Sequence, residues 1–362
     1  MSFAEYIWLD GAEPVSELRS KTRYVGASKQ APALSDFPEW SFDGSSTNQA
    51  AGSDSDCLLQ PVAFCRDPMR GEGNYLVLCE VLRPDGAPHE TNTRARLRDV
   101  LDAGAHAHDP WIGFEQEYTL FQGGRPLGFP ESGFPGPQGP YYCSVGADRA
   151  FGRAIAERHA ALCVEAGLLF YGINAEVMPG QWEFQVGYRG IDDEDPSALN
   201  VADHLWLARW LLHRIAEDAD IRVSFDNKPM KGDWNGAGMH TNFSTLLTRS
   251  ANGGIEEIER AVSRLAENHE DHIALYGDRL SERLTGLHET CSIREFRSGA
   301  GDRGASIRIP LGVAQKGNGY FEDRRPGANA DPYLVAARLA ATVCDVDDSG
   351  LRFYRADRKE AA

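Results

Sequence analysis

Residues 113–120, with the sequence Gly-Phe-Glu-Gln-Glu-Tyr-Thr-Leu, constrain this chain more than any other segment. Their aromatic and β-branched side chains predict a β-strand. Because side chains alternate between the two faces of a strand, Glu115 and Glu117 lie on the same face. Two neighbouring carboxylates repel each other unless a cation lies between them. A solvated sheet face is the simplest interpretation of this motif alone, and the motifs below favour a cation site instead.

The composition limits the function classes open to the chain. Its 362 residues are enough for two domains with a large core. The net charge of −17 argues against nucleic acid or an anionic membrane as a partner. The seven cysteines are scattered without a Cys-x-x-Cys pair, which disfavours zinc and a disulfide framework and fits a reduced, cytoplasmic protein. We expect no signal peptide and no membrane span.

The strand-like runs at residues 5–9, 21–25 and 75–82 predict a small β-rich domain. A boundary to a larger domain is expected near residue 100. Residues 36–49 form a turn-prone polar segment, for which an exposed loop and a substrate loop are both open. Residues 123–140 are dense in Gly and Pro, and a loop of that length inside a compact domain is usually functional or disordered.

Five helices are expected from the spacing of apolar residues. Asp331 followed by Pro332 is a strong signal for a helix start. Thr91 or Thr93 is expected to cap the first helix, and Asp148 the second. The predicted helices cover residues 91–107, 148–167, 197–219, 255–275 and 332–344.

Two strand-like runs in residues 174–185 flank the dipeptide Pro179-Gly180. If this dipeptide is the loop of a hairpin, Glu176 faces Glu183 and the two Cβ atoms lie about 5 Å apart. Such a pair of glutamates requires something positive between them. Pro-Gly suits a type II turn rather than the primed turns of tight hairpins, so the register stays open.

Residues 235–244, Asn-Gly-Ala-Gly-Met-His-Thr-Asn-Phe-Ser, combine small residues with His240 and Asn242. Small residues allow the backbone to approach a ligand closely. His240 and Asn242 would share one face of a strand. A lone histidine is more often a hydrogen-bonded structural residue, but the many carboxylates of this chain favour a metal ligand.

Arginines occur among small and apolar residues in the segments 303–310 and 319–326. A buried guanidinium is costly unless it meets an anion. Glu322 and Arg324 are two residues apart on a predicted strand, so a carboxylate and an anion-binding group would point the same way. The alternative is a structural ion pair with one of the many acids.

Together these segments resemble the eukaryote-like type II family of glutamine synthetases. The resemblance runs in order from about Tyr6 to about Pro332. It rests on the motifs Asp43-Gly-Ser-Ser-Thr47, Glu115-Gln-Glu-Tyr118, Phe134-Pro-Gly-Pro-Gln-Gly-Pro-Tyr-Tyr142, Gly146-Ala-Asp-Arg149, Asn174-Ala-Glu-Val-Met-Pro179, Gln181-Trp-Glu-Phe-Gln185, Asn235-Gly-Ala-Gly-Met-His-Thr-Asn242 and Tyr320-Phe-Glu-Asp-Arg-Arg-Pro326.

The resemblance implies an α+β fold with a small N-terminal β-grasp-like domain at residues 1–100. A large C-terminal catalytic domain at residues 101–362 would hold an antiparallel sheet flanked by helices. The implied reaction joins ammonia to L-glutamate at the expense of ATP, through γ-glutamyl phosphate. Partner expectations are L-glutamate, ammonium, ATP and copies of the same chain, as a decamer of two pentameric rings with sites shared between neighbours.

The resemblance also implies two Mg²⁺ or Mn²⁺ sites. One ion would lie near the ATP phosphates and the other near the glutamate, which agrees with the two-site reading of the Glu115–Glu117 strand. Carboxylates with one imidazole suit these ions better than structural zinc. The implied ligands are Glu115, His240 and Glu322 for the first ion, and Glu117, Glu176 and Glu183 for the second.

Further roles follow from the same resemblance. Tyr142 would lie near the ammonium. Glutamate would contact Asn235, Gly236, Arg283, Arg303 and Arg324. The nucleotide would be lined by Glu183, Phe184, Gln185, Val186, Gly187, Tyr188, Asn242, Phe243, Ser244, Arg303, Arg308, Tyr320, Phe321 and Glu322. The catalytic residues would be Asp43 for ammonium deprotonation, Glu289 on a closing flap, Arg308 and Arg324. Arg303 and Arg308 would neutralise the moving phosphoryl group.

Three segments depart from the family pattern. Arg294 and Arg297 are unexpected beside the flap, and Lys316-Gly-Asn-Gly319 is unusual before the tyrosine of the last motif. The tail after Gly350 has no counterpart. Two alternative functions stay open: a γ-glutamyl ligase for another amine, and a non-catalytic relative that keeps the rings.

Overall fold

The computed structural model describes residues 2–26 and 31–346, so the tail after Gly350 lies outside the described residues. The N-terminal part is a five-stranded sheet in the order β2-β1-β5-β4-β3. β1 and β5 are parallel, and the other neighbours are antiparallel. Its strands are β1 (Ser2–Leu9), β2 (Leu18–Gly26), β3 (Trp40–Asp43), β4 (Asp56–Arg66) and β5 (Tyr75–Leu82).

The predicted strands of this part are confirmed. A separate apolar cluster on one face of the sheet, which includes Tyr6, Trp8, Leu59 and Val77, gives it a core of its own. The turn-prone segment at 36–49 holds β3 and the 3₁₀ helix η2 (Gly44–Thr47), and a second 3₁₀ helix, η1 (Leu34–Asp36), precedes it.

The C-terminal part is built on a nine-stranded sheet with the path β12-β13-β14-β11-β6-β9-β8. β7 and β10 also pair with β6, and β12 with β13 is its one parallel pair among the described residues. Its strands are β6 (Trp111–Gln122), β7 (Arg125–Pro126), β8 (Phe170–Ala175), β9 (Gln181–Val186), β10 (Arg222–Ser224), β11 (Met239–Ser244), β12 (Ser298–Ala300), β13 (Ile307–Ile309) and β14 (Phe321–Asp323).

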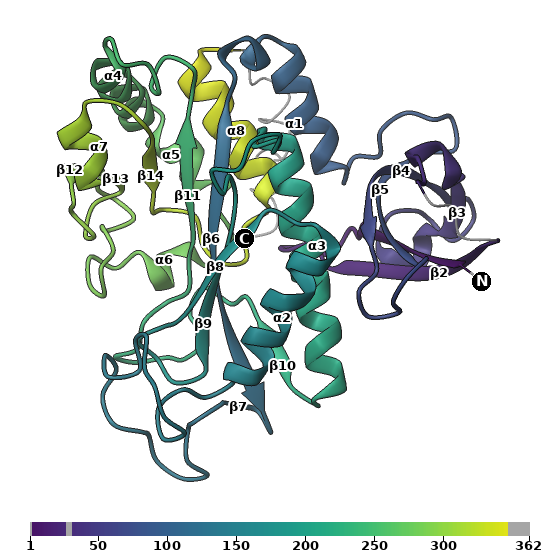
Figure 1. Cartoon of the computed structure of the whole chain (residues 1–362), viewed down its shortest axis with the longest axis horizontal. Coiled ribbons are helices and arrows are strands. Elements are labelled where there is room, and N and C mark those ends of the chain that lie inside the picture. The colour runs from purple at the N-terminus through teal and green to yellow at the C-terminus, as the bar shows by residue number, and fades with distance from the viewer. Residues whose placement is uncertain (1, 27–30, 347–362) are drawn as a thin grey trace.

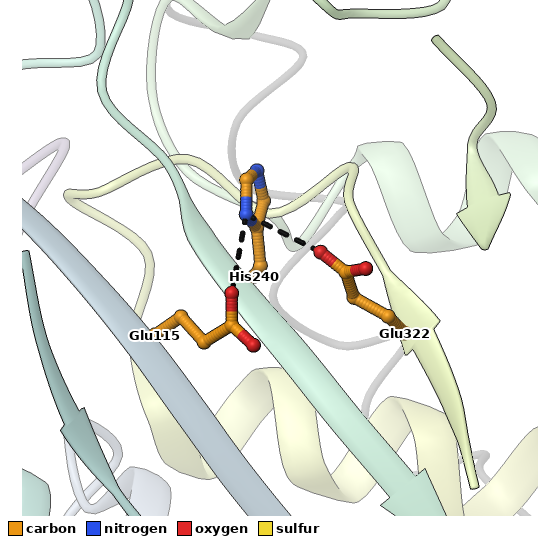
Figure 2. Close-up of side chains that lie close together, drawn as sticks. All are labelled: Glu115, His240 and Glu322. Atoms are coloured by element: carbon orange, nitrogen blue, oxygen red, sulfur yellow. Dashed lines mark ion pairs between the residues drawn. The ribbon is translucent and has the colours of Figure 1, made fainter. Parts of the chain in front are cut away.

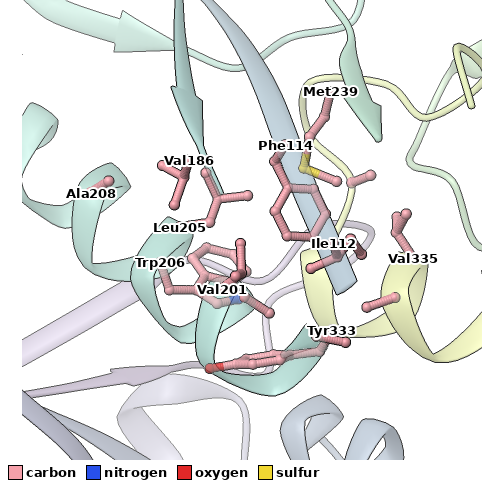
Figure 3. Close-up of a cluster of buried hydrophobic side chains, with 14 of the residues drawn as sticks. Ile112, Phe114, Val186, Val201, Leu205, Trp206, Ala208, Met239, Tyr333 and Val335 are labelled. Atoms are coloured by element: carbon pink, nitrogen blue, oxygen red, sulfur yellow. The ribbon is translucent and has the colours of Figure 1, made fainter. Parts of the chain in front are cut away.

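Helices α3 and α8 pack against this sheet through a shared apolar core (Figure 1). Figure 3 shows Phe114 and Met239 of the sheet beside Leu205 and Trp206 of α3 and Val335 of α8. The helices are α1 (Thr93–Asp102), η3 (Ala105–His108), α2 (Arg153–Ala166), α3 (Ala198–Asp218), α4 (Gly254–Glu267), α5 (His269–Ile273), α6 (Leu280–Arg283), α7 (Leu311–Lys316) and α8 (Pro332–Cys344).

The last predicted helix is confirmed, with the Asp331 side chain accepting a hydrogen bond from the backbone of Tyr333. Three of the other predicted helices differ from the structure. Asn92, not a threonine, caps α1. Asp148 does not cap α2, because Gly152, at φ 90°, is outside the helical region and the helix begins after it. The helix predicted at 255–275 is broken into α4 and α5 at Asn268.

Buried ion pairs tie the N-terminal sheet to the helices of the C-terminal part. Glu80 of β5 accepts hydrogen bonds from Arg94 at 2.8 Å and Arg98 at 2.6 Å, both on α1. Arg94 also donates two bonds of 2.8 Å to Asp203 on α3, which accepts a bond from Tyr333 of α8. The boundary predicted near residue 100 stays a prediction. No helix within residues 2–26 and 31–346 is long and apolar enough to cross a membrane.

Candidate active site

An acidic cavity of about 490 Å³ opens on the face of the C-terminal sheet that carries Glu115 and Glu117. The shared face predicted for these two glutamates is therefore observed. Alternate residues of the same strand, Phe114, Gln116 and Tyr118, are fully buried on the other side. The charged and titratable part of the lining combines five acids, two histidines and four arginines: Glu115, Glu117, Glu176, Glu183, Glu289, His240, His288, Arg283, Arg303, Arg308 and Arg324.

Glu115, His240 and Glu322 come together from three adjacent strands, β6, β11 and β14 (Figure 2). His240 lies directly opposite Glu115 in the ladder. Its Nδ1 is 3.8 Å from Glu115 Oε2 and 3.5 Å from Glu322 Oε1. One potential ligand atom from each residue lies within 4.8 Å of the others, so this group can hold a metal ion. Burial and the nearby arginines lower the pKa of His240, which keeps the imidazole neutral and able to act as a ligand.

Arginines flank this first group. Glu322 pairs with Arg308 Nη1 at 2.7 Å and with Arg324 Nη1 at 2.6 Å. The neighbouring residues on the same segment point the other way: Asp323 pairs with Arg325 in the core, and Tyr276 donates a hydrogen bond to Asp323. The structural ion pair considered for Arg324 is thus present, and Arg324 lines the cavity as well.

The second group consists of Glu117, Glu176 and Glu183. The hairpin register predicted for it is wrong: Glu183 lies opposite Asn174, not Glu176. A turn closed by Gln181 N to Met178 O makes the connection five residues long, so Glu176 lies just past the end of β8. Glu183 instead faces Glu117 across β6 and β9, so two glutamates do oppose each other, on a different pair of strands.

These three carboxylates are buried together. Burial, followed by the charges of neighbouring glutamates, raises the pKa of Glu183, and the pKa of Glu176 rises to about 8 for the same reasons. Burial also raises the pKa of Glu117. Potential ligand atoms of Glu117, Glu183 and His240 lie within 4.8 Å of one another, whereas Glu176 contributes to the lining beside them. A cluster of hard oxygen ligands that cannot all be ionised without a cation fits a divalent metal ion.

Arg283 lies at the floor of the cavity. Its Nη2 is 2.9 Å from His240 Nε2, and its Nη1 donates to the backbone oxygen of Arg324 at 3.1 Å. Burial lowers the pKa of Arg283 to about 10. Gly236 has to be glycine, because a Cβ there would lie 2.6 Å from the Arg283 side chain. The small residues predicted to allow close approach therefore make room for an arginine.

A second cavity of about 460 Å³ adjoins the first. The two are linked where Asn242 Nδ2 donates to Glu115 Oε1 at 2.9 Å. Six predicted nucleotide residues line it, namely Gly187, Tyr188, Asn242, Phe243, Ser244 and Tyr320. Glu183, Gln185, Arg303 and Arg308 line the acidic cavity instead. The side chains of Phe184, Val186 and Phe321 lie in the hydrophobic core.

The predicted flap residue Glu289 also lines the acidic cavity. Both Glu289 and the preceding His288 have positive φ, at 59° and 53°. Gln138, from the Gly/Pro-rich loop, contacts His288 Nδ1 at 3.0 Å and accepts a hydrogen bond from the Asn235 backbone at 2.6 Å. That loop therefore closes one side of the cavity, with Tyr142 half-exposed at its rim.

Asp43 lies outside both cavities, in the N-terminal part. It is exposed and caps η2, where it accepts hydrogen bonds from Ser45 and Ser46. These bonds lower the pKa of Asp43, and the bond from the Ser45 side chain has the largest effect. The Asp43 side chain is therefore a carboxylate at neutral pH.

Several lining residues were missed by the sequence analysis. Trp111 and Arg249 form one wall of the second cavity, with the guanidinium 3.9 Å from the centre of the indole ring. Lys316, noted only as a departure, lines the same cavity. Of the two unexpected arginines, Arg294 is exposed and Arg297 donates to the backbone oxygen of Gly304 at 2.6 Å.

Comparisons with known proteins cover nearly the whole chain. The family model described as glutamine synthetase, beta-Grasp domain, matches residues 1–84, and that described as glutamine synthetase, catalytic domain, matches residues 90–270. The chain is 55% identical to a glutamine synthetase of Streptomyces viridochromogenes, covering 94% of this chain and 96% of that one. It is 54% identical to a chloroplastic glutamine synthetase of Chlamydomonas reinhardtii, covering 94% and 90%.

Among solved structures, a Plasmodium falciparum glutamine synthetase determined by cryoEM is similar in fold, with a TM-score of 0.74. Its sequence is 17% identical, and the match covers 95% of this chain and 71% of that chain.

Proposed function

The chain belongs to the glutamine synthetase family, and from this premise we propose that its two adjoining cavities bind the substrates of glutamine synthesis. The reaction is the ATP-dependent ligation of ammonia to the γ-carboxylate of L-glutamate, through γ-glutamyl phosphate, with ADP and phosphate as the other products. The α+β fold, with an N-terminal β-grasp domain and a C-terminal catalytic domain, is the one expected from the sequence.

The observation that carries the proposal is the presence of both signs of charge in the acidic cavity. Buried carboxylates with raised pKa values and four guanidinium groups line the same cavity. Such a cavity fits Mg²⁺ or Mn²⁺ beside an anionic substrate. Glu115, His240 and Glu322 would hold one ion, and Glu117, Glu176 and Glu183 the other. Metal ions there would neutralise phosphate charge.

The arginines act on the anionic groups. Arg283, Arg303 and Arg324, with Asn235 and Gly236, hold the glutamate. Arg303 and Arg308 neutralise the phosphoryl group as it moves. The support for Arg308 is that its Nε is buried without a hydrogen-bond partner among the described residues, which leaves a donor for an anion. Because phosphoryl transfer depends mostly on positioning and charge neutralisation, fixed guanidinium groups of this kind supply much of what the step needs.

ATP occupies the second cavity, with its phosphates toward the acidic cavity. Asn242 supports this orientation, because it lines the second cavity and hydrogen-bonds Glu115 in the first. The aromatic rings of Trp111, Tyr188 and Tyr320 offer flat surfaces to the base. Phe184, Val186 and Phe321 support the neighbouring strands from the core.

Asp43 accepts a proton from ammonium, with Tyr142 nearby, in the acidic cavity of a neighbouring copy of the chain. Its exposed position outside its own chain's cavities supports a shared site. The assembly is a decamer of two pentameric rings. Glu289 closes over the acyl phosphate and excludes water, which would otherwise hydrolyse it. The protein works in the cytoplasm, in keeping with seven cysteines that form no disulfide.

The direct test is phosphate release from ATP with Mg²⁺ or Mn²⁺, measured with glutamate and ammonia together and with each omitted. We expect full turnover only with both. Hydroxylamine and methylamine in place of ammonia test the alternative amine ligase. Phosphate release that does not depend on glutamate would overturn the proposal.

Single-turnover ATP cleavage separates two roles. Arg308→Ala should slow phosphoryl transfer on the order of 10³-fold or more, because transition-state charge is left uncompensated. Asp43→Asn should keep glutamate-dependent cleavage and lose ammonia turnover, less so at high pH, where more ammonia is already neutral. Equal loss of cleavage in both variants, in intact assemblies, would contradict this division.

Subunit mixing tests the shared site. Asp43→Ala and Glu322→Ala are each expected to be inactive, and exchange between them creates some interfaces with both residues intact. Recovered activity is expected in mixed assemblies, and its absence in assemblies shown to be mixed would refute the sharing.

A further inference from the structure

A third cavity, of about 530 Å³, lies on the opposite side of the C-terminal sheet from the acidic cavity, between α3, β10 and the loop that joins β1 to β2. Figure 1 shows α3 between the N-terminal sheet and β10. One face of α3 lines it, with residues at helical spacing from Trp206 to Glu217. Residues 15–18 of the N-terminal part cover one side. Neither the sequence motifs nor the proposed reaction uses this cavity.

Arg209 lines the cavity and is only 3% exposed. Its Nε and Nη2 donate to Gln116 Oε1, and Nη2 also donates to the backbone oxygens of Ala328 and Ala330. Within the described part of the chain, no carboxylate forms an ion pair with it and its Nη1 has no hydrogen-bond partner. Burial lowers the pKa of Arg209 to about 9. The charge of Asp331 offsets only part of this effect, and the two residues form no ion pair, so the guanidinium has no direct anionic partner among the described residues.

The walls around Arg209 are aromatic. Its guanidinium carbon lies 4.6 Å from the centre of the Trp206 ring and 5.1 Å from that of Phe225. Trp210 lines the cavity beside them. Flat apolar walls around a cation fit a planar ligand whose polar group is negative.

The rim carries charges of both signs. Glu217 pairs with Arg214, and Glu17 lies 3.7 Å from Arg19, whose closer partner is Asp10 at 2.8 Å. Arg222 lines the rim, lies over an aromatic ring and forms no ion pair among the described residues. With Arg209, the lining holds three arginines and two glutamates, so its net charge is positive in a chain whose net charge is −17.

We propose that this cavity binds a small aromatic carboxylate, with the carboxylate on Arg209 Nη1 and the ring between the aromatic walls. The cavity volume suits a ligand of this size. The carboxylate gives Arg209 a directly hydrogen-bonded anion, and a charged hydrogen bond in a buried site contributes more than a neutral one.

The same arginine connects the cavity to the acidic site. Gln116, which Arg209 holds, lies on β6 between Glu115 and Glu117. A ligand that draws the guanidinium toward the cavity alters the support of that strand. We therefore expect occupancy to change the metal concentration needed for activity, and this part rests on the proposed function.

Benzoate is the probe, with neutral benzamide of the same shape as its control. Titration calorimetry of the full-length protein, with glutamate, ADP and Mg²⁺ saturating, measures binding away from the acidic cavity. Benzoate should bind at one site per chain, about tenfold or more tighter than benzamide. No saturable binding, or equal affinities for the two probes, would overturn the proposal.

Two variants place the site. Ser16 lies on the half-buried loop over the cavity, so Ser16→Trp fills the mouth while Ser16→Ala is its matched control. Benzoate binding should be lost in the first and kept in the second, and binding that survives Ser16→Trp would refute this location.

Arg209→Lys should bind benzoate more tightly than Arg209→Gln, if both fold. If saturating benzoate leaves the metal dependence of wild-type activity unchanged, the proposed effect of occupancy on the acidic site is wrong. Calorimetry still measures benzoate binding itself, whatever the outcome of that activity assay.

Discussion

Two clusters of buried carboxylates in this chain differ in how their charge is compensated. Glu80 and Asp203, between the N-terminal sheet and the helices, accept hydrogen bonds from Arg94 and Arg98. Glu117, Glu176 and Glu183, in the acidic cavity, lie against one another, and the pKa values of all three are raised. Yet all five residues are less than a tenth exposed. Burial alone therefore does not identify a functional acid.

The difference separates a structural use from a ligand-binding one. An acid with an arginine partner is satisfied inside the chain and fixes two elements relative to each other. Glu176 and Glu183, whose charged neighbours are other glutamates, lack a compensating charge until a cation arrives, whereas Arg283 and Arg324 offset part of the charge of Glu117. Glu322 stands between these cases, since it approaches His240 at a potential metal site and also pairs with two arginines.

The largest expected effect on stability is at the compensated cluster. Glu80→Gln removes the only ion-pair partner found for Arg98 among the described residues and one of the two partners of Arg94. We expect the free energy of unfolding to fall by about 3 kcal/mol, because breaking a buried pair leaves charge uncompensated. Urea unfolding measures it. Glu90→Gln is the control: Glu90 pairs with Arg83 in solvent, and the loss there should be below about 1 kcal/mol. Equal losses in both variants would break the comparison.

The same cluster should make the fold sensitive to acid. Burial opposes ionisation of Glu80, but hydrogen bonds from Arg98 and Arg94 outweigh it and lower its pKa below the usual 4.5. The unfolded chain therefore binds the proton more readily. The stabilisation is fully present above pH 4.5 and is lost as the pH falls through the folded-state pKa. Unfolding curves from pH 7 to pH 3 should lose stability less steeply in Glu80→Gln, and an unchanged slope would assign the acid sensitivity elsewhere.

The smallest effect, of opposite sign, is expected at the uncompensated cluster. Glu183→Gln relieves a like-charge contact with Glu117, which should raise the stability of the metal-free protein by about 0.2–1 kcal/mol. The gain is small because the raised pKa already keeps part of the cluster protonated. Stabilisation by added Mg²⁺ should be weakened. Thermal unfolding with and without Mg²⁺ measures both, with exposed Glu165→Gln as control. A loss of metal-free stability would mean that Glu183 is compensated after all.

The metal dependence of activity tests whether Glu176 also belongs to the cluster that lacks arginine partners. Glu176→Ala should raise the metal concentration needed for half-maximal activity while the fold stays intact, since this carboxylate has no arginine partner among the described residues. Activity titrations with Mg²⁺ and Mn²⁺ test this. Metal dependence identical to that of the parent protein would remove Glu176 from the second metal group.

Local signals in the sequence predicted much of the fold. The alternation of β6 placed Glu115 and Glu117 on one face, and Asp331-Pro332 placed the start of α8. The β8–β9 register was missed, because the turn at Met178–Gln181 lengthens the connection and an error in loop length changes every cross-strand partner. The opposed glutamates were anticipated, but their strands were not.

The sequence predicted which residue types form the site better than it predicted their contacts. The cavity is lined by segments that lie far apart in the sequence, and only the family resemblance indicated that they come together. The wall formed by Trp111 and Arg249 was not anticipated, since an aromatic residue at a strand start and an arginine after a strand carry no local signal. The nucleotide residues were predicted as contiguous ranges. Side chains alternate between the two faces of a strand, so Phe184 and Phe321 point into the core instead of the cavity.

The alternation along residues 322–325 limits how this part of the chain can change in evolution. Glu322 and Arg324 face the cavity, while Asp323 and Arg325 pair in the core. An insertion or deletion of a single residue here would exchange the two faces, burying the cavity pair and withdrawing the core pair from Tyr276. Substitutions can be absorbed one at a time, but a change of length cannot.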